Sequence, residues 1–115
     1  MTDTMLTWTQ GVYAFDRKDY GAAVEHFSQV LAAEPGNLNC REYLARAQYH
    51  RASLGPAEQE ARRILEVDPT NEYVQMLLAR ALERQGRHEE AAGVRRVLAA
   101  LSGDARHAAG HRAFA

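Results

Sequence analysis

Only a few residues in this chain have the types and the spacing that chemistry requires. His107 and His111 are four residues apart, which would place two zinc ligands on one face of a helix. Because structural zinc usually takes four protein ligands and no third ligand lies nearby in the sequence, we expect no metal and no cofactor. The other histidines, His26, His50 and His88, are dispersed. No Ser/His/Asp or Cys/His arrangement, and therefore no enzyme active site, is predicted.

Cys40 is the only cysteine, so an internal disulfide is excluded. It lies near the predicted start of a helix, where the pKa of a thiol can be lowered, although partly buried packing is the favoured interpretation. Neither Gly11 nor Gly86 follows a predicted strand, and the chain has no glycine-rich phosphate loop. An enzyme or metal protein is therefore the weakest hypothesis, because it rests on Cys40 and two histidines alone.

The composition is typical of one globular domain over residues 1–115, with 46% apolar and 25% charged residues. The net charge is −1, and the five acidic and two basic side chains of residues 1–37 form no basic patch, so no nucleic-acid partner is expected. No apolar run approaches the roughly 20 residues of a membrane span, and Met1 to Leu6 lack the pattern of a signal peptide. We therefore expect no membrane partner and a cytoplasmic protein; the preference for arginine over lysine suggests a high-GC bacterium.

The strongest pattern in the chain is a period of 34 residues. Pro35 and Pro69 are separated by this distance, as are Asn37 and Asn71. Small residues recur in two further registers: Gly11, Ala45 and Ala79, and Ala23, Ala57 and Ala91. A period of this length indicates stacked structural repeats, which act through a surface rather than through a catalytic pocket.

Each period is predicted to hold two helices joined by a short turn, because apolar residues recur at three- and four-residue spacing. Asp3 and Asp19 are placed to cap the first two helices, and Pro35-Gly36-Asn37 ends one helix and caps the next. Later boundaries are marked by Ser53, Pro69-Thr70-Asn71, the turn Gln85-Gly86-Arg87, and Asp104, which is placed to cap a short helix through about Ala113. No strand alternation is found, so the predicted fold is all-α: an α-solenoid of three helix-turn-helix hairpins plus a short C-terminal helix.

These registers resemble the tetratricopeptide (TPR) repeat, with small residues at repeat positions 8 and 20 and proline at position 32. The resemblance places the repeats at about residues 4–37, 38–71 and 72–105, with a tail or capping helix at 104–115. The segment Lys18-Asp19-Tyr20 is similar to the family's Gly-Asp-Tyr turn. The chain departs from the family at position 4, which is often Trp, at the aromatic position 24 of the third repeat and at the last position 32: Thr7, Arg41 and Gln75, then Arg95, then Gly103.

The resemblance implies a concave groove lined by the first helix of each repeat, at positions 2, 5, 9, 12 and 13. The candidate groove residues are Met5, Trp8, Val12, Phe15, Arg46, Tyr49, His50, Tyr73, Arg80 and Arg84. This set would suit a peptide with a bulky apolar anchor and a carboxylate, because arginine binds carboxylates through two hydrogen bonds and aromatic side chains dominate binding hot spots. In the alternative interpretation, Phe15 and Tyr49 belong to the core and the arginines are solvated or paired with Glu42 or Glu83.

One TPR subfamily binds acidic C-terminal tails through a clamp of lysine, asparagine and arginine side chains. The clamp positions hold different residue types here: Trp8, Val12, Tyr43, Tyr73 and Leu77. Clamp-type tail binding is therefore not expected.

The last hairpin carries an apolar set that needs a cover: Val94, Val97, Leu98 and Leu101. Either the tail 104–115 or a second subunit would cover it. The leading hypothesis is a non-enzymatic module that binds a peptide or partner protein in the groove, and the alternative is a structural module that self-assembles through its end faces.

Overall fold

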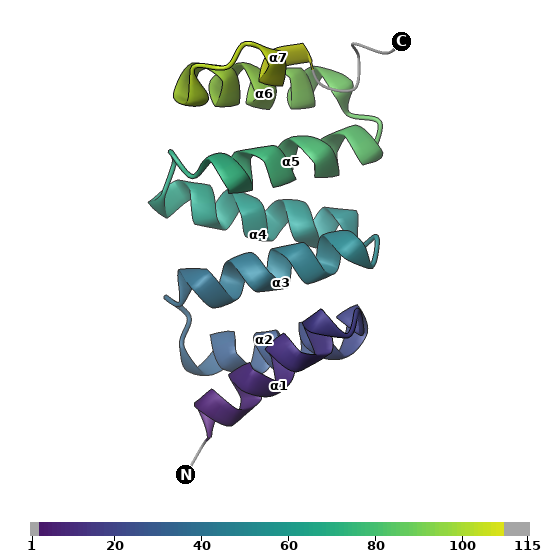
Figure 1. Cartoon of the computed structure of the whole chain (residues 1–115), viewed down its shortest axis with the longest axis vertical. Coiled ribbons are helices and arrows are strands. Elements are labelled where there is room, and N and C mark those ends of the chain that lie inside the picture. Colours follow the sequence, from purple (N-terminus) through teal and green to yellow (C-terminus); the bar gives the residue numbers. More distant parts are fainter. Residues whose placement is uncertain (1–2, 110–115) are drawn as a thin grey trace. The chain divides into compact units, whose positions relative to one another are not determined.

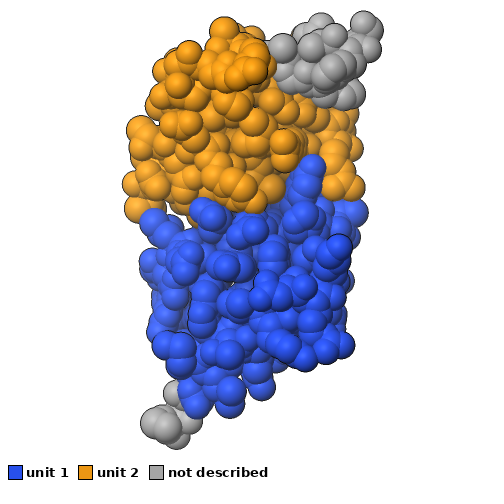
Figure 2. Space-filling model, in the orientation of Figure 1, with its two compact units in different colours: residues 1–60 blue, residues 61–115 orange. Residues whose placement is uncertain are grey.

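The computed structural model describes residues 3–109, and seven helices without strands make up the regular structure of this range (Figure 1). The helices are α1 (Thr4–Asp16), α2 (Tyr20–Ala33), α3 (Leu38–His50), α4 (Leu54–Val67), α5 (Glu72–Arg84), α6 (His88–Ser102) and α7 (Arg106–Ala109). The predicted all-α fold class is confirmed. The chain divides into two compact units, residues 1–60 and 61–115, with the boundary inside α4 (Figure 2).

Four helices begin at a side-chain cap: three caps were predicted from the sequence, and the fourth, Asn71, lies in a segment predicted as a boundary. In each case the amide three residues later donates to the cap's Oδ1, at 2.9 Å for Asp3, 3.3 Å for Asp19, 2.9 Å for Asn37 and 3.1 Å for Asn71. Such a cap satisfies one of the orphan amides of the first turn and stabilises a helix by about 1 kcal/mol. The starts of α1, α2, α3 and α5 are therefore set by local chemistry.

The three turns between paired helices share one backbone conformation. Lys18, Ala52 and Gly86, spaced by the 34-residue period, have φ of 63°, 61° and 77°. Each of them donates its amide to the carbonyl three residues back, at 2.9, 3.0 and 2.9 Å. The next residue donates to the carbonyl five back, at 2.8, 2.8 and 3.0 Å. This left-handed geometry closes the end of a helix and costs a residue other than glycine roughly 1–2 kcal/mol.

In unit 1 the small residue at repeat position 8 allows α1 to pack closely on α2. A Cβ at Gly11 would lie 2.6 Å from Cε1 of Phe27 and 3.2 Å from Cβ of His26. Phe27 is fully buried, so it has no space to move away. The core around it is formed by α1, α2 and α3: Ala14, Ala23, Val30, Leu31, Cys40, Leu44 and Ala47.

The polar residues at repeat position 4 bind the proline loops. Arg41 Nη2 donates to the carbonyl of Pro35 at 3.0 Å, and Gln75 Nε2 donates to the carbonyl of Pro69 at 3.1 Å. Arg41 also forms an ion pair with Glu60. The departure from the family's tryptophan thus gives each of these loops a side-chain hydrogen bond.

In unit 2, α5 packs against α6, and α6 packs against α7. Gly103, with φ of 74°, ends α6 in the left-handed conformation where the earlier repeats have proline. The amide of Arg106 donates to Asp104 Oδ1 at 3.0 Å, and hydrogen bonds from Arg106 lower the pKa of Asp104 to about 2. The predicted cap at Asp104 is therefore present, whereas the predicted end of this helix at Ala113 lies outside the described residues.

The repeated left-handed turn predicts opposite effects of two substitutions. We expect Lys18→Gly to raise the free energy of unfolding by about 0.5–1 kcal/mol, because relief of backbone strain exceeds the added chain entropy. Gly86→Ala should lower the free energy of unfolding by a similar amount, for the same reason. Urea denaturation of both variants measures the effect, and shifts of the same sign would contradict the shared strain.

Candidate functional site

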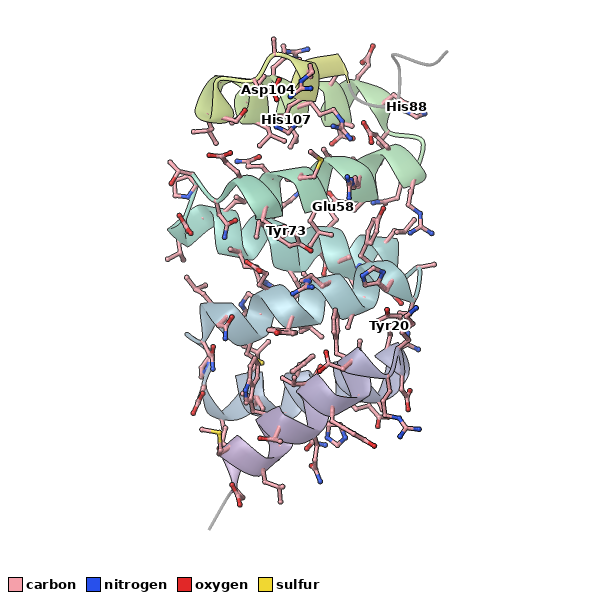
Figure 3. All side chains as sticks on the ribbon, in the orientation of Figure 1. Tyr20, Glu58, Tyr73, His88, Asp104 and His107 are labelled. Carbon is pink, nitrogen blue, oxygen red and sulfur yellow. The ribbon has the colours of Figure 1, made fainter. Side chains whose placement is uncertain are left out.

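Half-buried aromatic side chains run along α1 of unit 1, where the sequence placed the first part of the groove. The Trp8 ring lies 5.4 Å from that of Phe27 and 5.2 Å from that of Tyr43, between centroids. The Phe15 ring lies 5.4 Å from Tyr43 and 5.5 Å from Tyr20 (labelled in Figure 3). Tyr43 therefore joins the two predicted groove aromatics. The repeat pattern does not place Tyr43 in the groove, because the position of Tyr43 in the sequence does not show that it contacts both rings.

Arg46 is held against this aromatic cluster. Its guanidinium carbon lies 4.9 Å from the ring centroid of Phe15 and 5.1 Å from that of Tyr43. His50 stacks on Tyr20 at 4.8 Å with an interplanar angle of 21° and contacts Phe15 edge-on at 6.0 Å. These contacts fix an arginine and a histidine beside aromatic surface, an arrangement stabilised by cation–π attraction for Arg46.

Two of the remaining predicted groove residues of unit 1 differ in how exposed they are. Val12 is half-buried and packs against the core, whereas Met5 is largely exposed. Tyr49 is half-buried, and its ring lies 5.9 Å from that of His50. Phe15 and Val12 pack against the core and are also partly exposed, so the core interpretation holds in part for Phe15.

A cavity of about 230 Å³ opens beside Met5 and Trp8 in unit 1. Its lining comes from the starts of α1 and α3 and from the end of α2: Thr4, Met5, Trp8, Val30, Glu34, Asn37 and Asn39. Sequence reasoning found Met5 and Trp8 but missed Val30 and Glu34. Val30 belongs to α2 and Glu34 is its C-cap, and the groove pattern covers neither.

In unit 2 the three predicted groove residues are exposed on α5. The side chain of Tyr73 (labelled in Figure 3) is 49% exposed, and Arg80 and Arg84 are also exposed. An exposed tyrosine and two arginines on one helix provide both a flat aromatic surface and donors for carboxylates. This surface belongs to unit 2.

A buried ion pair lies beside these residues in unit 2. Arg95 is 8% exposed, and its Nε and Nη2 donate to the two carboxylate oxygens of Glu83 at 2.6 and 2.9 Å. Its Nη1 also donates to Met76 Sδ at 3.6 Å and to the carbonyl of His107 at 3.4 Å. Arg95 therefore occupies the family's aromatic position with a guanidinium that contacts α5 and α7. The alternative interpretation of the sequence paired Glu83 with a groove arginine. The pairing of Glu83 with Arg95 could not be predicted from their positions in the sequence.

The apolar set on α6 is only partly exposed. Leu98 is 1% exposed and belongs to the core of unit 2, and Val94 is half-buried. Val97 and Leu101 remain 48% and 36% exposed. α7 packs on α6, and the rest of the predicted cover, residues 110–115, lies outside the described residues.

Cys40 is buried, so the packing interpretation is confirmed and the lowered pKa is wrong. Its Sγ donates to the carbonyl of Phe27 at 3.4 Å, and burial, with a further contribution from the charge of Glu34, raises the pKa of the thiol to about 11. A thiol with this pKa is a poor nucleophile at neutral pH.

Of the candidate zinc ligands His107 and His111, only His107 is among the described residues. Within residues 3–109, no three His, Cys, Asp or Glu side chains are placed to hold a metal ion. The helices of this same range are too short or too polar to cross a membrane.

Comparison with known proteins gives one family and several solved structures. The family described as "Tetratricopeptide repeat" matches residues 14–81. No curated protein matches the chain in sequence. A structure titled "MamA D159K mutant 2" is 24% identical, with a TM-score of 0.83, over 89% of this chain and 56% of its own, so the present chain spans just over half of that protein.

Two solved TPR domains are similar over more of their own length. The Arabidopsis OM64 TPR domain is 21% identical, with a TM-score of 0.80, over 91% of this chain and 87% of that domain. The Sgt2 TPR domain from Aspergillus fumigatus is 18% identical, with a TM-score of 0.82, over 99% of this chain and 80% of its own. These similarities concern the fold, and they confirm the predicted α-solenoid class.

The buried ion pair predicts a stability effect that depends on both partners. We expect Arg95→Leu to lower the free energy of unfolding by about 3–5 kcal/mol, because the Glu83 carboxylate stays buried without its bidentate partner. The double variant Arg95→Leu/Glu83→Leu should recover most of this loss. Urea denaturation would compare them with Arg96→Leu, which removes the exposed neighbouring arginine; a double variant as unstable as the single one would contradict the prediction.

Proposed function

Because the chain belongs to the tetratricopeptide repeat family, we propose that it is a non-enzymatic module that binds a peptide segment or partner protein in the groove formed by first helices. TPR relatives act as protein-interaction modules, and the first helices of the three repeats here are α1, α3 and α5. The proposal takes the ten candidate residues of these helices as its binding surface.

The observation that carries the proposal is the position of Arg46 over Phe15 and Tyr43, at 4.9 and 5.1 Å. A guanidinium stacked on two rings loses less conformational entropy when it binds a ligand, because its orientation is already restricted. Arginine and aromatic residues are also the types most enriched in binding hot spots. An acidic or carboxylate-bearing segment next to an apolar side chain would satisfy this surface.

The exposed side chains of α5 support the same ligand chemistry in unit 2. Tyr73, Arg80 and Arg84 occupy groove positions of α5, and all three are exposed. Trp8 packs against the rings of Phe27 and Tyr43, so in this proposal its remaining surface is a rigid wall for a side chain of the ligand.

Affinity capture from a lysate of the native organism tests the proposal with a matched pair of variants. We expect Arg80→Ala/Arg84→Ala to reduce recovery of bound proteins by at least about tenfold, because both arginines lie at groove positions on α5. Arg63→Ala/Arg96→Ala removes the same charge from exposed sites outside the groove positions and should leave recovery unchanged. Equal recovery with the two double variants, measured by quantitative mass spectrometry, would contradict the groove assignment.

As a second candidate function we propose self-assembly through exposed apolar side chains. Leu6 and Tyr13 on α1 are more than half exposed, and Val97 and Leu101 on α6 are exposed as well. An interface between two different surfaces of the same chain joins copies head to tail.

Light scattering over a range of concentrations tests this second candidate. The wild-type chain should increase in mass with concentration, and Val97→Glu/Leu101→Glu should remain monomeric, because charged side chains oppose burial of that surface. A wild-type mass that stays monomeric at every concentration would exclude self-assembly.

A further inference from the structure

The cavity of unit 1 has the size of a site for one side chain. At about 230 Å³ it is smaller than the roughly 300–1,000 Å³ of small-molecule pockets. It lies at the end of α1 that carries Met5 and Trp8, and α2 and α3 supply the rest of its lining. A partner that follows the groove positions of α1 would therefore pass its opening.

The apolar part of the lining suits a long, flexible side chain. Trp8 is held by the rings of Phe27 and Tyr43, so its remaining surface is a rigid wall, and Val30 adds a buried aliphatic contact. Met5 is exposed and flexible, and can adapt to whatever enters. Aliphatic stems of lysine and arginine pack well on such surfaces, and tryptophan is the aromatic residue that attracts cations most strongly.

The charge of the lining is negative. Among the described residues 3–109, Glu34 is the only ionisable one in the lining, and its Oε1 accepts a hydrogen bond from the neutral amide of Asn37 at 2.9 Å. No cation among residues 3–109 pairs with Glu34. Glu34 follows the last turn of α2, where the helix dipole is also negative.

Two features support a negative potential in the cavity. The starts of α1 and α3 contribute partial positive charge, but the Asp3 carboxylate already neutralises the start of α1. The charge of Glu34 contributes to the raised pKa of Cys40 on α3, so its field reaches the start of that helix. An anionic side chain would therefore be repelled from the cavity.

We propose that the cavity binds a lysine or arginine side chain of the partner, with its stem on Trp8 and Met5 and its cationic group on Glu34. This rests on the proposed function, and it adds a basic residue to the sequence that the partner must carry. The proposed contact of the partner with Arg46, in the same unit, has the opposite sign. The partner is thus a segment of mixed charge in which one basic residue enters the cavity.

Trp8 allows the proposal to be tested directly, because it is the only tryptophan and lines the cavity. The probes are acetylated and amidated heptapeptides Ser-Gly-Leu-X-Leu-Gly-Ser, in which X is arginine, norleucine or glutamate. Titration of the whole chain with each peptide is followed by tryptophan fluorescence and by the indole N–H resonance in NMR spectra. We expect the arginine peptide to bind about fivefold more tightly than the norleucine peptide, and the glutamate peptide to bind most weakly.

Two isosteric variants distinguish the effect of the Glu34 carboxylate from the effect of the net charge of unit 1. Glu34→Gln should abolish the preference for arginine over norleucine. Glu25→Gln makes the same charge change at an exposed position of α2 outside the cavity and should retain the preference. The proposal is overturned if the wild-type chain binds no arginine peptide at millimolar concentration, if arginine and norleucine bind equally, or if both variants lose the preference.

The experiments distinguish rejection of the basic-residue site from rejection of the proposed function. If the cavity fails this test while Arg80→Ala/Arg84→Ala still loses captured proteins, only the basic-residue site is rejected. If capture shows no difference between the groove variant and its control, the groove assignment itself is rejected, whatever the peptides show.

Discussion

The close approach of α1 to α2 is the constraint on which the rest of unit 1 depends. Because Gly11 has no Cβ, the ring of Phe27 can lie directly against the backbone of α1. That contact fixes Phe27 in the core, and Phe27 in turn supports Trp8 and Tyr43. The aromatic cluster, the placement of Arg46 and the wall of the cavity all follow from this single missing methyl group.

The candidate site joins two opposite electrostatic surfaces through these aromatics. At one end of the aromatic cluster of unit 1, a guanidinium lies on the rings of Phe15 and Tyr43. At the other end, Trp8 lines a cavity to which the described part of the chain contributes one charged group, the carboxylate of Glu34. The aromatic cluster therefore lies between the cation of Arg46 and the anion of Glu34. These two charges can orient a ligand along the helix, because a reversed ligand would place like charges together.

The features that the sequence could predict are those decided within a few residues. Asp3, Asp19, Asn37 and Asn71 cap helices by hydrogen bonds to amides three positions away, so residue type and spacing suffice to find them. The small residues at repeat positions 8 and 20 could also be found, because they recur with the 34-residue period. Most of the groove candidates came from the family's register, and whether they bind a partner is still a prediction.

The features that the sequence could not predict depend on contacts between distant residues. Arg95 looked like a simple loss of an aromatic residue, and only the packing of α5, α6 and α7 shows that Glu83 is its partner. Nothing in the sequence pattern marks Glu34, because the cavity beside it is formed by contacts of α1, α2 and α3. For Cys40 the favoured packing interpretation is confirmed, but the depth of burial comes from contacts with distant residues, which proximity to a helix start does not show.

The burial of Cys40 gives unit 1 an internal reporter of its own opening. Its sulfur is protonated at neutral pH, lies against Phe27 and is shielded from solvent. An alkylating reagent can therefore modify it only during moments when the helices separate. Since no other cysteine competes for the reagent, the rate of modification measures how often the aromatic cluster comes apart.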